Sequence, residues 1–260
     1  MTLPSSASAA TTEERQLSPF ELAQDRLIVA LDVPAIDAAL ALADKLKDTC
    51  RWFKVGLELY LAAGPAIVEK LVCRGHSVFL DLKLHDIPNT VAAAVRSTDS
   101  LGAALLTVHA AGGPAMLAAA QEVAAGIANG PQLLAVTVLT SMDQAQLAAT
   151  GVSSNPQEQV ALLARLGLDA GMRGFVCSAQ EAGALRAMTG AEGMLVTPGI
   201  RPAGAELGDQ KRIATPTYAL EQGASRLVVG RPITQAADPA LAAEAILLEI
   251  AEALAIAPTE

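Results

Sequence analysis

The segment VFLDLKLHDIPNT, residues 78–90, places a compact group of charges inside an apolar run. Residues 78–84 are rich in branched and aromatic side chains, and the Ile-Pro-Asn sequence that follows is typical of a strand end. Asp81 and Lys83 lie two positions apart, so on a strand both side chains point to the same face. Burying such charges is costly unless they are paired. With Asp86 they form the pattern Asp-x-Lys-x-x-Asp, which fits either a strand-end ion pair with a turn aspartate or an active site.

Outward from this segment, apolar runs alternate with stretches of helical spacing. The predicted strands are 27–33, 52–56, 78–84, 103–109, 133–139, 173–177, 193–197 and 226–229. The predicted helices are 37–47, 64–74, 89–101, one after Pro114, 156–168, one after Ser178, 215–222 and 239–255. Eight strands alternating with helices predict a single-domain (β/α)8 TIM barrel rather than an open doubly wound sheet.

We expect the barrel domain to span residues 18–260. Residues 1–17 are rich in Ser, Thr and Ala and lack the cationic start and apolar core of a secretory signal. They are therefore predicted to be a disordered lead-in.

Composition narrows the classes of function. The chain has 260 residues, 52% of them hydrophobic and only 3% aromatic, so its core must consist mainly of Ala, Leu and Val. A net charge of -9 argues against nucleic-acid or anionic-membrane partners. No apolar run reaches the roughly 18 residues of a membrane span. The three cysteines are odd in number and lack metal-like spacing, which favours reduced thiols in a cytoplasmic protein.

The residues that could carry chemistry share one position in the predicted fold, the C-terminal end of a strand. They are Asp32, Lys54, Asp81, Lys83, Thr140, Ser141, Arg201 and Arg231. These ends meet at one face of a barrel, where barrel enzymes build their active sites. A solvated loop charge would explain any one of them, but it explains the eight together poorly.

The last two predicted strands are followed by a glycine and an arginine each. Gly230 and Arg231 follow strand 226–229, and Pro198, Gly199 and Arg201 follow strand 193–197. Barrels often hold phosphate there, because glycine lets backbone N–H groups approach and arginine adds a planar bidentate donor. No G-x-x-x-x-G-K-[ST] occurs, and no G-x-G-x-x-G follows a strand. One phosphate monoester therefore fits better than a triphosphate or a dinucleotide.

Eight motifs, in order, resemble the orotidine 5'-monophosphate decarboxylase family over nearly all of residues 25–256. They are LDV (31–33), FKVGL (53–57), DLKLHDIPNT (81–90), VHAAGG (108–113), VTVLTS (136–141), TPGIRP (197–202), GDQKR (208–212) and VGRPIT (229–234). The resemblance implies an enzyme without metal or cofactor that converts orotidine 5'-monophosphate to uridine 5'-monophosphate (UMP) and CO2, the last step of UMP synthesis. It also implies a homodimer whose active sites are shared across the interface.

The resemblance assigns the charged residues to catalysis. Lys83 matches the family's proton donor to pyrimidine C6, and Asp81 matches the carboxylate that faces the departing carboxylate of the substrate. Lys54 and Asp86 match the rest of an alternating charge network, in which the second aspartate comes from the partner subunit.

The resemblance also implies a set of substrate contacts. Those residues are Asp32 and Lys54 at the ribose, Thr140 and Ser141 at the pyrimidine edge, Ile87 and Thr90 across the subunits, and Pro198, Arg201, Gln210, Gly230 and Arg231 around the phosphate. The loop 203–209 would be a mobile lid. Some relatives place Gln directly after the Arg-Pro pair, whereas this chain has Ala203, so Gln210 would have to make any bridging contact alone.

Two other readings compete. A magnesium-dependent sugar-phosphate decarboxylase or aldolase-like barrel shares the Asp-x-Lys-x-x-Asp pattern, but the continuation 87–90 and the Thr140-Ser141 pair argue against it. A non-catalytic phosphate sensor predicts the loss of a network residue, and all four are present. His85 and His109 are interpreted as structural hydrogen-bonding residues rather than general bases.

Overall fold

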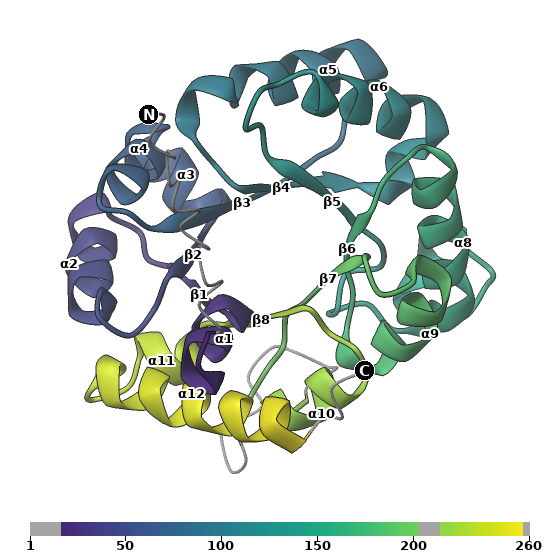
Figure 1. Ribbon diagram of the computed structural model, residues 1–260. Helices are drawn as coiled ribbons and strands as arrows, with labels where there is room; N and C mark the ends of the chain where they lie inside the picture. The colour runs from purple at the N-terminus through teal and green to yellow at the C-terminus, as the bar shows by residue number, and fades with distance from the viewer. Residues whose placement is uncertain (1–16, 203–213, 257–260) are drawn as a thin grey trace, which may run out of the picture.

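Eight parallel strands close into a barrel in the order in which the chain forms them (Figure 1). The structure is a computed structural model that describes residues 17–202 and 214–256. The strands are β1 (Leu27–Ala30), β2 (Trp52–Gly56), β3 (Ser77–Leu84), β4 (Leu105–His109), β5 (Gln132–Val136), β6 (Gly174–Val176), β7 (Met194–Thr197) and β8 (Arg226–Val229). The predicted (β/α)8 architecture is confirmed.

The main helices form a ring outside the barrel, as predicted (Figure 1). They are α2 (Ile36–Leu46), α4 (Ala66–Cys73), α5 (Pro88–Ser97), α6 (Gly113–Ala125), α8 (Pro156–Asp169), α9 (Ala179–Thr189), α10 (Pro216–Glu221) and α12 (Pro239–Ile256). The predicted start of α8 is confirmed by reciprocal hydrogen bonds: the Glu158 N–H donates to Asn155 Oδ1, and the Asn155 N–H donates to Glu158 Oε2.

Several short elements were missed by sequence reasoning. They are α1 (Pro19–Arg26), α3 (Leu57–Ala63), α7 (Gln144–Ala149), α11 (Arg231–Thr234) and the 3-10 turn η2 (Ala110–Gly112), whereas the 3-10 turn η1 (Asp99–Leu101) falls within the predicted helix 89–101. Helix α1 packs against α12 and begins after Ser18, whose hydroxyl accepts the Glu21 N–H. Apart from Leu17, the expected disordered lead-in lies outside the described residues.

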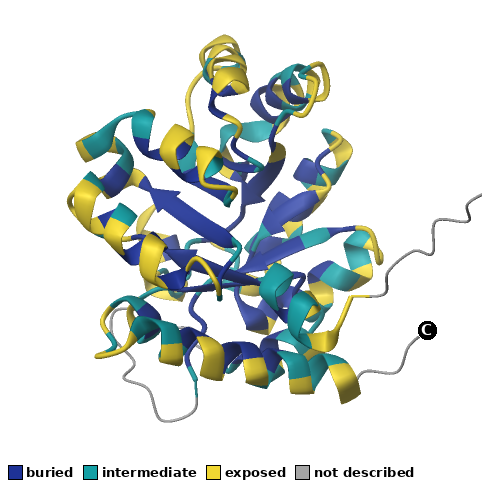
Figure 2. Ribbon diagram, turned by 60° about the vertical axis from the view of Figure 1, so that its left-hand side comes forward, coloured by how far each residue is buried: buried dark blue, intermediate teal, exposed yellow. Residues whose placement is uncertain are grey.

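Apolar side chains fill two layers, one inside the barrel and one between the barrel and its helices. Figure 2 shows the strands as the buried centre, with the exposed helix surfaces outside. The inner layer comprises Ile28, Ala30, Trp52, Phe79, Leu105, Leu134, Val196 and Val228. Because side chains alternate along a strand, Asp81 faces the barrel interior as Phe79 does, two residues earlier. The polar site therefore lies directly above the inner apolar layer of the barrel.

The N-terminal end of the barrel is closed by Trp52 and Arg226. The Arg226 guanidinium carbon lies 3.8 Å from the centroid of the Trp52 ring, a cation–π contact. Burial lowers the pKa of Arg226 to about 10. The open end of the barrel is therefore the opposite one, where the strands end.

Arg186 on α9 ties the start of β7 to the start of β8. Its guanidinium donates to the carbonyl oxygens of Gly193 at 2.7 Å and Gly223 at 2.8 Å, and to Ser225 Oγ at 2.8 Å. We expect Arg186→Ala to lower the free energy of unfolding by about 3 kcal/mol, because several acceptors lose a charged donor. Arg186→Lys should recover little, since lysine lacks the planar fork. Urea unfolding checks this against Arg165→Ala on the exposed face of α8; equal midpoints for Arg186→Ala and Arg165→Ala would refute it.

Candidate active site

Four charged side chains alternate in sign across the C-terminal ends of β1, β2 and β3. Lys83 Nζ lies 2.8 Å from Asp81 Oδ1 and 2.9 Å from Oδ2. Lys54 Nζ lies 2.8 Å from Asp32 Oδ1 and 3.7 Å from Asp81 Oδ2. The order across the site is therefore Asp32, Lys54, Asp81, Lys83, and we call it the charge row. The structure brings together these four predicted residues.

Burial is greatest in the middle of the charge row. The side chains of Lys54 and Asp81 are only 11% and 12% exposed, whereas those of Lys83 and Asp32 are 32% and 59% exposed. Two nearly buried charges are tolerated because each lies between partners of opposite sign. The outer members can therefore meet a ligand while the inner members hold them in place.

Strand β3 is irregular between Asp81 and Lys83, which the simple alternation of side chains along a strand does not predict. The register between β3 and β4 shifts between Leu80 and Leu84, and Lys83 has a φ of 52°. The expectation of a regular strand at Asp81 and Lys83 is therefore corrected: the two side chains meet across an irregularity of the strand.

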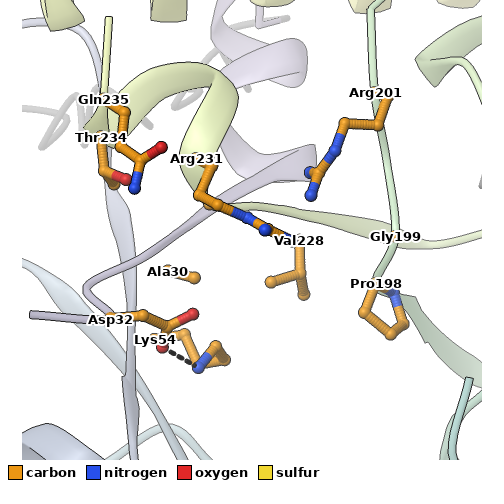
Figure 3. Close-up of a pocket in the computed structure, with 11 residues that line it drawn as sticks. Ala30, Asp32, Lys54, Pro198, Gly199, Arg201, Val228, Arg231, Thr234 and Gln235 are labelled. Carbon is orange, nitrogen blue, oxygen red and sulfur yellow. Dashed lines mark hydrogen bonds and ion pairs between the residues drawn. The ribbon is translucent and has the colours of Figure 1, made fainter. Parts of the chain in front are cut away.

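A cavity of about 410 Å³ opens beside Asp32 and Lys54. Figure 3 shows the guanidinium groups of Arg201 and Arg231 pointing toward one another across it, with the Asp32–Lys54 ion pair on one side. The lining residues are Ala30, Asp32, Lys54, Pro198, Gly199, Arg201, Val228, Gly230, Arg231, Thr234 and Gln235. Two arginines that face one cavity can bind a phosphate through several charged hydrogen bonds.

The turn after β7 that carries Arg201 depends on glycine. Gly199 has a φ of 78°, a conformation that other residues adopt only with strain. Arg201 is only 7% exposed, and its Nη1 donates to the carbonyl of Ile200 at 3.0 Å. The side chain is therefore already held in place within the cavity wall.

A second cavity of about 240 Å³ lies on the other side of Pro198, which lines both. Asp81 and Lys83 form its charged part, Thr140 and Ser141 add hydroxyl groups, and the apolar wall consists of Val136, Val138, Leu139, Val176 and Cys177. A small flat ring with polar edges suits this lining. The charge row thus runs between an arginine-lined cavity and a mostly apolar one.

Three predicted site residues lie apart from both cavities. Asp86, Ile87 and Thr90 follow β3 on exposed backbone, and Asp86 Oδ1 accepts the N–H of Ile87 at 2.6 Å. A single chain does not bring them to the charge row. Gln210 and the predicted lid 203–209 lie outside the described residues.

The two histidines near the site lie against one another. The rings of His85 and His109 stack with centroids 5.3 Å apart, and His109 Nδ1 accepts the Ala111 N–H at 3.3 Å. Burial, followed by the charges of His85 and Lys83, lowers the pKa of His109. For His109, a neutral imidazole that accepts a backbone hydrogen bond agrees with the interpretation from the sequence, whereas for His85 that interpretation stays a prediction.

Sequence reasoning missed several residues of the site, including Thr107, Thr234, Gln235 and Gly56. The first lies buried beside Asp81, and the next two line the larger cavity. Gly56 could have been singled out from the motif FKVGL, because its neighbour Lys54 is a charged residue of the same strand. Thr107, by contrast, could not be found in this way, because its contact with Asp81 depends on the register between β3 and β4, which the sequence does not reveal.

Gly56 supplies a prediction. A β-carbon there would lie 2.8 Å from Lys54 Nζ and 3.3 Å from Asp32 Oδ1, so Gly56→Ala must displace the ammonium. We expect kcat/KM to fall by about 100-fold, the scale of a misplaced catalytic group. The matched control is Gly126→Ala, whose β-carbon would meet only backbone oxygens at 3.5 Å and 3.7 Å. Equal kinetics for the two variants would show that the glycine is not needed.

A closed barrel with a charge row at the C-terminal ends of its strands defines a (β/α)8-barrel enzyme. The sequence model of the Orotidine 5'-phosphate decarboxylase / HUMPS family matches residues 25–246. The chain belongs to this family.

Individual relatives agree over most of their length. Orotidine 5'-phosphate decarboxylase of Rhodopseudomonas palustris is 55% identical over 230 residues, which cover 88% of this chain and 96% of the relative. The enzyme of the same name from Nitrosococcus oceani is 52% identical over 227 residues, 87% of this chain and 98% of the relative. The crystal structure of orotidine 5'-phosphate decarboxylase from Lactobacillus acidophilus superposes with a TM-score of 0.76 at 40% identity, covering 87% and 99% of the two chains.

No helix within residues 17–202 and 214–256 is both long and apolar enough to cross a membrane. This finding agrees with the absence of a long apolar run in the sequence.

Proposed function

We propose that the protein decarboxylates orotidine 5'-monophosphate to UMP and CO2, the last step of UMP biosynthesis, without a metal or cofactor. The observation that carries the proposal is the charge row between two adjoining cavities, one lined by arginines and one mostly apolar. A nucleotide has the matching parts, an anionic phosphate, a ribose with hydroxyl groups and a flat pyrimidine.

The substrate fits the two cavities in one direction. Its phosphate binds Arg201, Arg231 and the backbone at Gly230, while its ribose hydroxyls meet Asp32 and Lys54. The pyrimidine enters the smaller cavity, where Thr140 and Ser141 supply polar contacts to its edge. This orientation brings the C6 carboxylate toward Asp81 and Lys83. Gln210 is proposed as a further phosphate contact.

The reaction needs positive charge at a carbon atom. When the bond from C6 to the carboxylate breaks, CO2 leaves and the electron pair stays on C6 as a carbanion without an adjacent electron sink. The Lys83 ammonium stabilises this charge and then transfers a proton to C6, which leaves a neutral amine that regains a proton from solvent. At about 4 Å a pair of unit charges attracts by roughly 4 kcal/mol at an effective dielectric of about 20, compared with about 1 kcal/mol in water. Excluding water therefore strengthens the effect.

Asp81 has two compatible roles. Its carboxylate holds the Lys83 ammonium at 2.8 Å, so the cation is already in position before substrate arrives. The same carboxylate would lie near the carboxylate of the substrate and repel it until CO2 leaves. Binding energy from the remote phosphate offsets this repulsion.

A homodimer completes the proposed site. Asp86, Ile87 and Thr90 are exposed next to β3, and large apolar side chains on α3 are also exposed, Leu57 by 50% and Leu61 by 80%. We propose that pairing of two copies covers these residues and brings Asp86 of the partner subunit to the end of the charge row.

Mixing two inactive variants tests the shared site. Lys83→Ala and Asp86→Ala should each be inactive alone, but a heterodimer has one active site that carries neither substitution. Random pairing in equal amounts should restore about a quarter of wild-type activity, because half of the dimers are mixed and half of their sites are intact. No recovery after subunit exchange, with each variant still dimeric, would refute the shared site.

A cytoplasmic location stays a prediction. It is supported by the three cysteines, none of which is in a disulfide; Cys50 and Cys177 are buried and Cys73 is exposed.

The experiment that tests the proposed activity follows the loss of orotate absorbance when orotidine 5'-monophosphate is mixed with purified, chelator-treated protein. We expect turnover at the same rate with and without EDTA. Turnover only with added magnesium and a sugar phosphate would favour the related barrel enzymes that use a metal. Binding of the nucleotide without turnover would favour a sensor.

A further inference from the structure

Thr107 on β4 stands opposite the irregular part of β3. Between two successive paired positions, Leu80 and Leu84, β3 advances four residues while β4 advances two. The segment 81–83 therefore faces Thr107 alone. Lys83 has a left-handed backbone with a φ of 52°, which is unfavourable for a residue with a β-carbon. A contact outside the regular ladder must hold this conformation.

The Thr107 hydroxyl makes that contact and a second one. It accepts the backbone N–H of Lys83 at 2.8 Å and donates its own proton to Asp81 Oδ1 at 3.0 Å. The residue is fully buried. A hydroxyl has one proton to donate and lone pairs to accept, so one side chain serves both neighbours.

We infer that Thr107 is a positioning residue that sets the places of the Lys83 ammonium and the Asp81 carboxylate. The inference rests on the proposed function of these two groups. Thr107 lines neither of the two cavities and so acts through its neighbours. The bond from the Lys83 N–H fixes the backbone from which that ammonium extends, and the bond to Asp81 fixes the rotation of the carboxylate.

Both contacts end on the same ion pair. Asp81 Oδ1 accepts the Thr107 hydroxyl at 3.0 Å and the Lys83 ammonium at 2.8 Å. Removing the hydroxyl therefore takes one supporting hydrogen bond from each member of the pair at once. A side chain that merely filled space would have no such effect, which separates positioning from packing.

Two variants separate the hydroxyl from the volume of the side chain. Thr107→Val keeps the shape but removes the hydroxyl, and Thr107→Ser keeps the hydroxyl. In Thr107→Val we expect kcat to fall by about 10- to 100-fold, the effect of losing hydrogen bonds to a charged group and to a buried N–H. KM and the affinity for UMP should change by less than about threefold, because the phosphate and ribose contacts remain. Thr107→Ser should keep kcat within about threefold of wild type.

Wild-type kcat in Thr107→Val overturns the inference. Equal loss in Thr107→Ser and Thr107→Val also overturns it, since the hydroxyl would then not be the cause. A rise in KM with unchanged kcat does the same, because it would place the effect in binding.

A readout without substrate keeps this test separate from the proposed function. Amide hydrogen exchange at Lys83 should be at least about tenfold faster in Thr107→Val than in wild type, and near wild type in Thr107→Ser. Unchanged exchange in Thr107→Val overturns the inference whether or not the protein decarboxylates its substrate. If exchange at Lys83 is faster in Thr107→Val but the wild-type protein shows no turnover, the positioning contact stands and only the proposed reaction is refuted.

Discussion

Replacing Lys83 with alanine is expected to lower kcat by at least about 10⁴-fold while the barrel stays folded. One ammonium supplies both the positive charge at C6 and the proton, and each effect alone is worth about 100-fold or more. The fold should survive because the Lys83 side chain is partly exposed and Asp81 keeps its contacts with Lys54 and Thr107.

Steady-state decarboxylation and circular dichroism measure the two parts of this prediction. Lys70→Ala is the matched control, because Lys70 is an exposed lysine on α4, away from the charge row. Its kinetics should equal those of wild type. A Lys83→Ala variant that turns over within about tenfold of wild type would remove Lys83 from the chemistry.

Replacing Arg231 with alanine is expected to lower kcat/KM for the phosphorylated substrate by about 10³-fold, mainly through KM. The phosphate would lose a planar guanidinium donor that points into the larger cavity. Binding energy from the phosphate also drives the substrate into the reactive position, so a smaller fall in kcat should accompany the rise in KM.

Orotidine without its phosphate provides the internal control for this prediction. Its slow turnover should be the same in wild type and in Arg231→Ala, since neither makes a phosphate contact with it. Arg165→Ala, an exposed arginine of α8, controls for the loss of a positive charge. Unchanged kcat/KM for the phosphorylated substrate in Arg231→Ala would contradict the proposed phosphate site.

The barrel could be predicted because each strand is indicated by a short apolar run in the local sequence. Strand 226–229 and the cap of α8 at Asn155 were placed correctly from apolar runs and capping residues alone. Two of the C-terminal ends were predicted less well: β1 stops at Ala30 and β5 at Val136, three residues before the predicted strands do. After these residues the chain leaves the sheet and forms part of the site, although the sequence stays apolar, so the strand ends could not be read from the apolar runs.

The charge row was predicted from the positions of its residues, because the C-terminal ends of the strands of a barrel converge. Thr107 was not, because its importance arises from the shift of register between β3 and β4 and from the left-handed backbone at Lys83. Asp86 marks another limit of a single chain. Its proposed place in the network requires a second copy, which the sequence implied only through family resemblance.

Our main proposal is that Lys83, fixed beside Asp81, meets the reacting carbon of a nucleotide. A crystal structure of the protein with UMP bound tests it most directly. We expect pyrimidine C6 within about 3.5 Å of Lys83 Nζ, close to hydrogen-bond range, and the phosphate between Arg201 and Arg231. A nucleotide bound elsewhere, or one bound in these cavities with C6 turned away from Lys83, would contradict it.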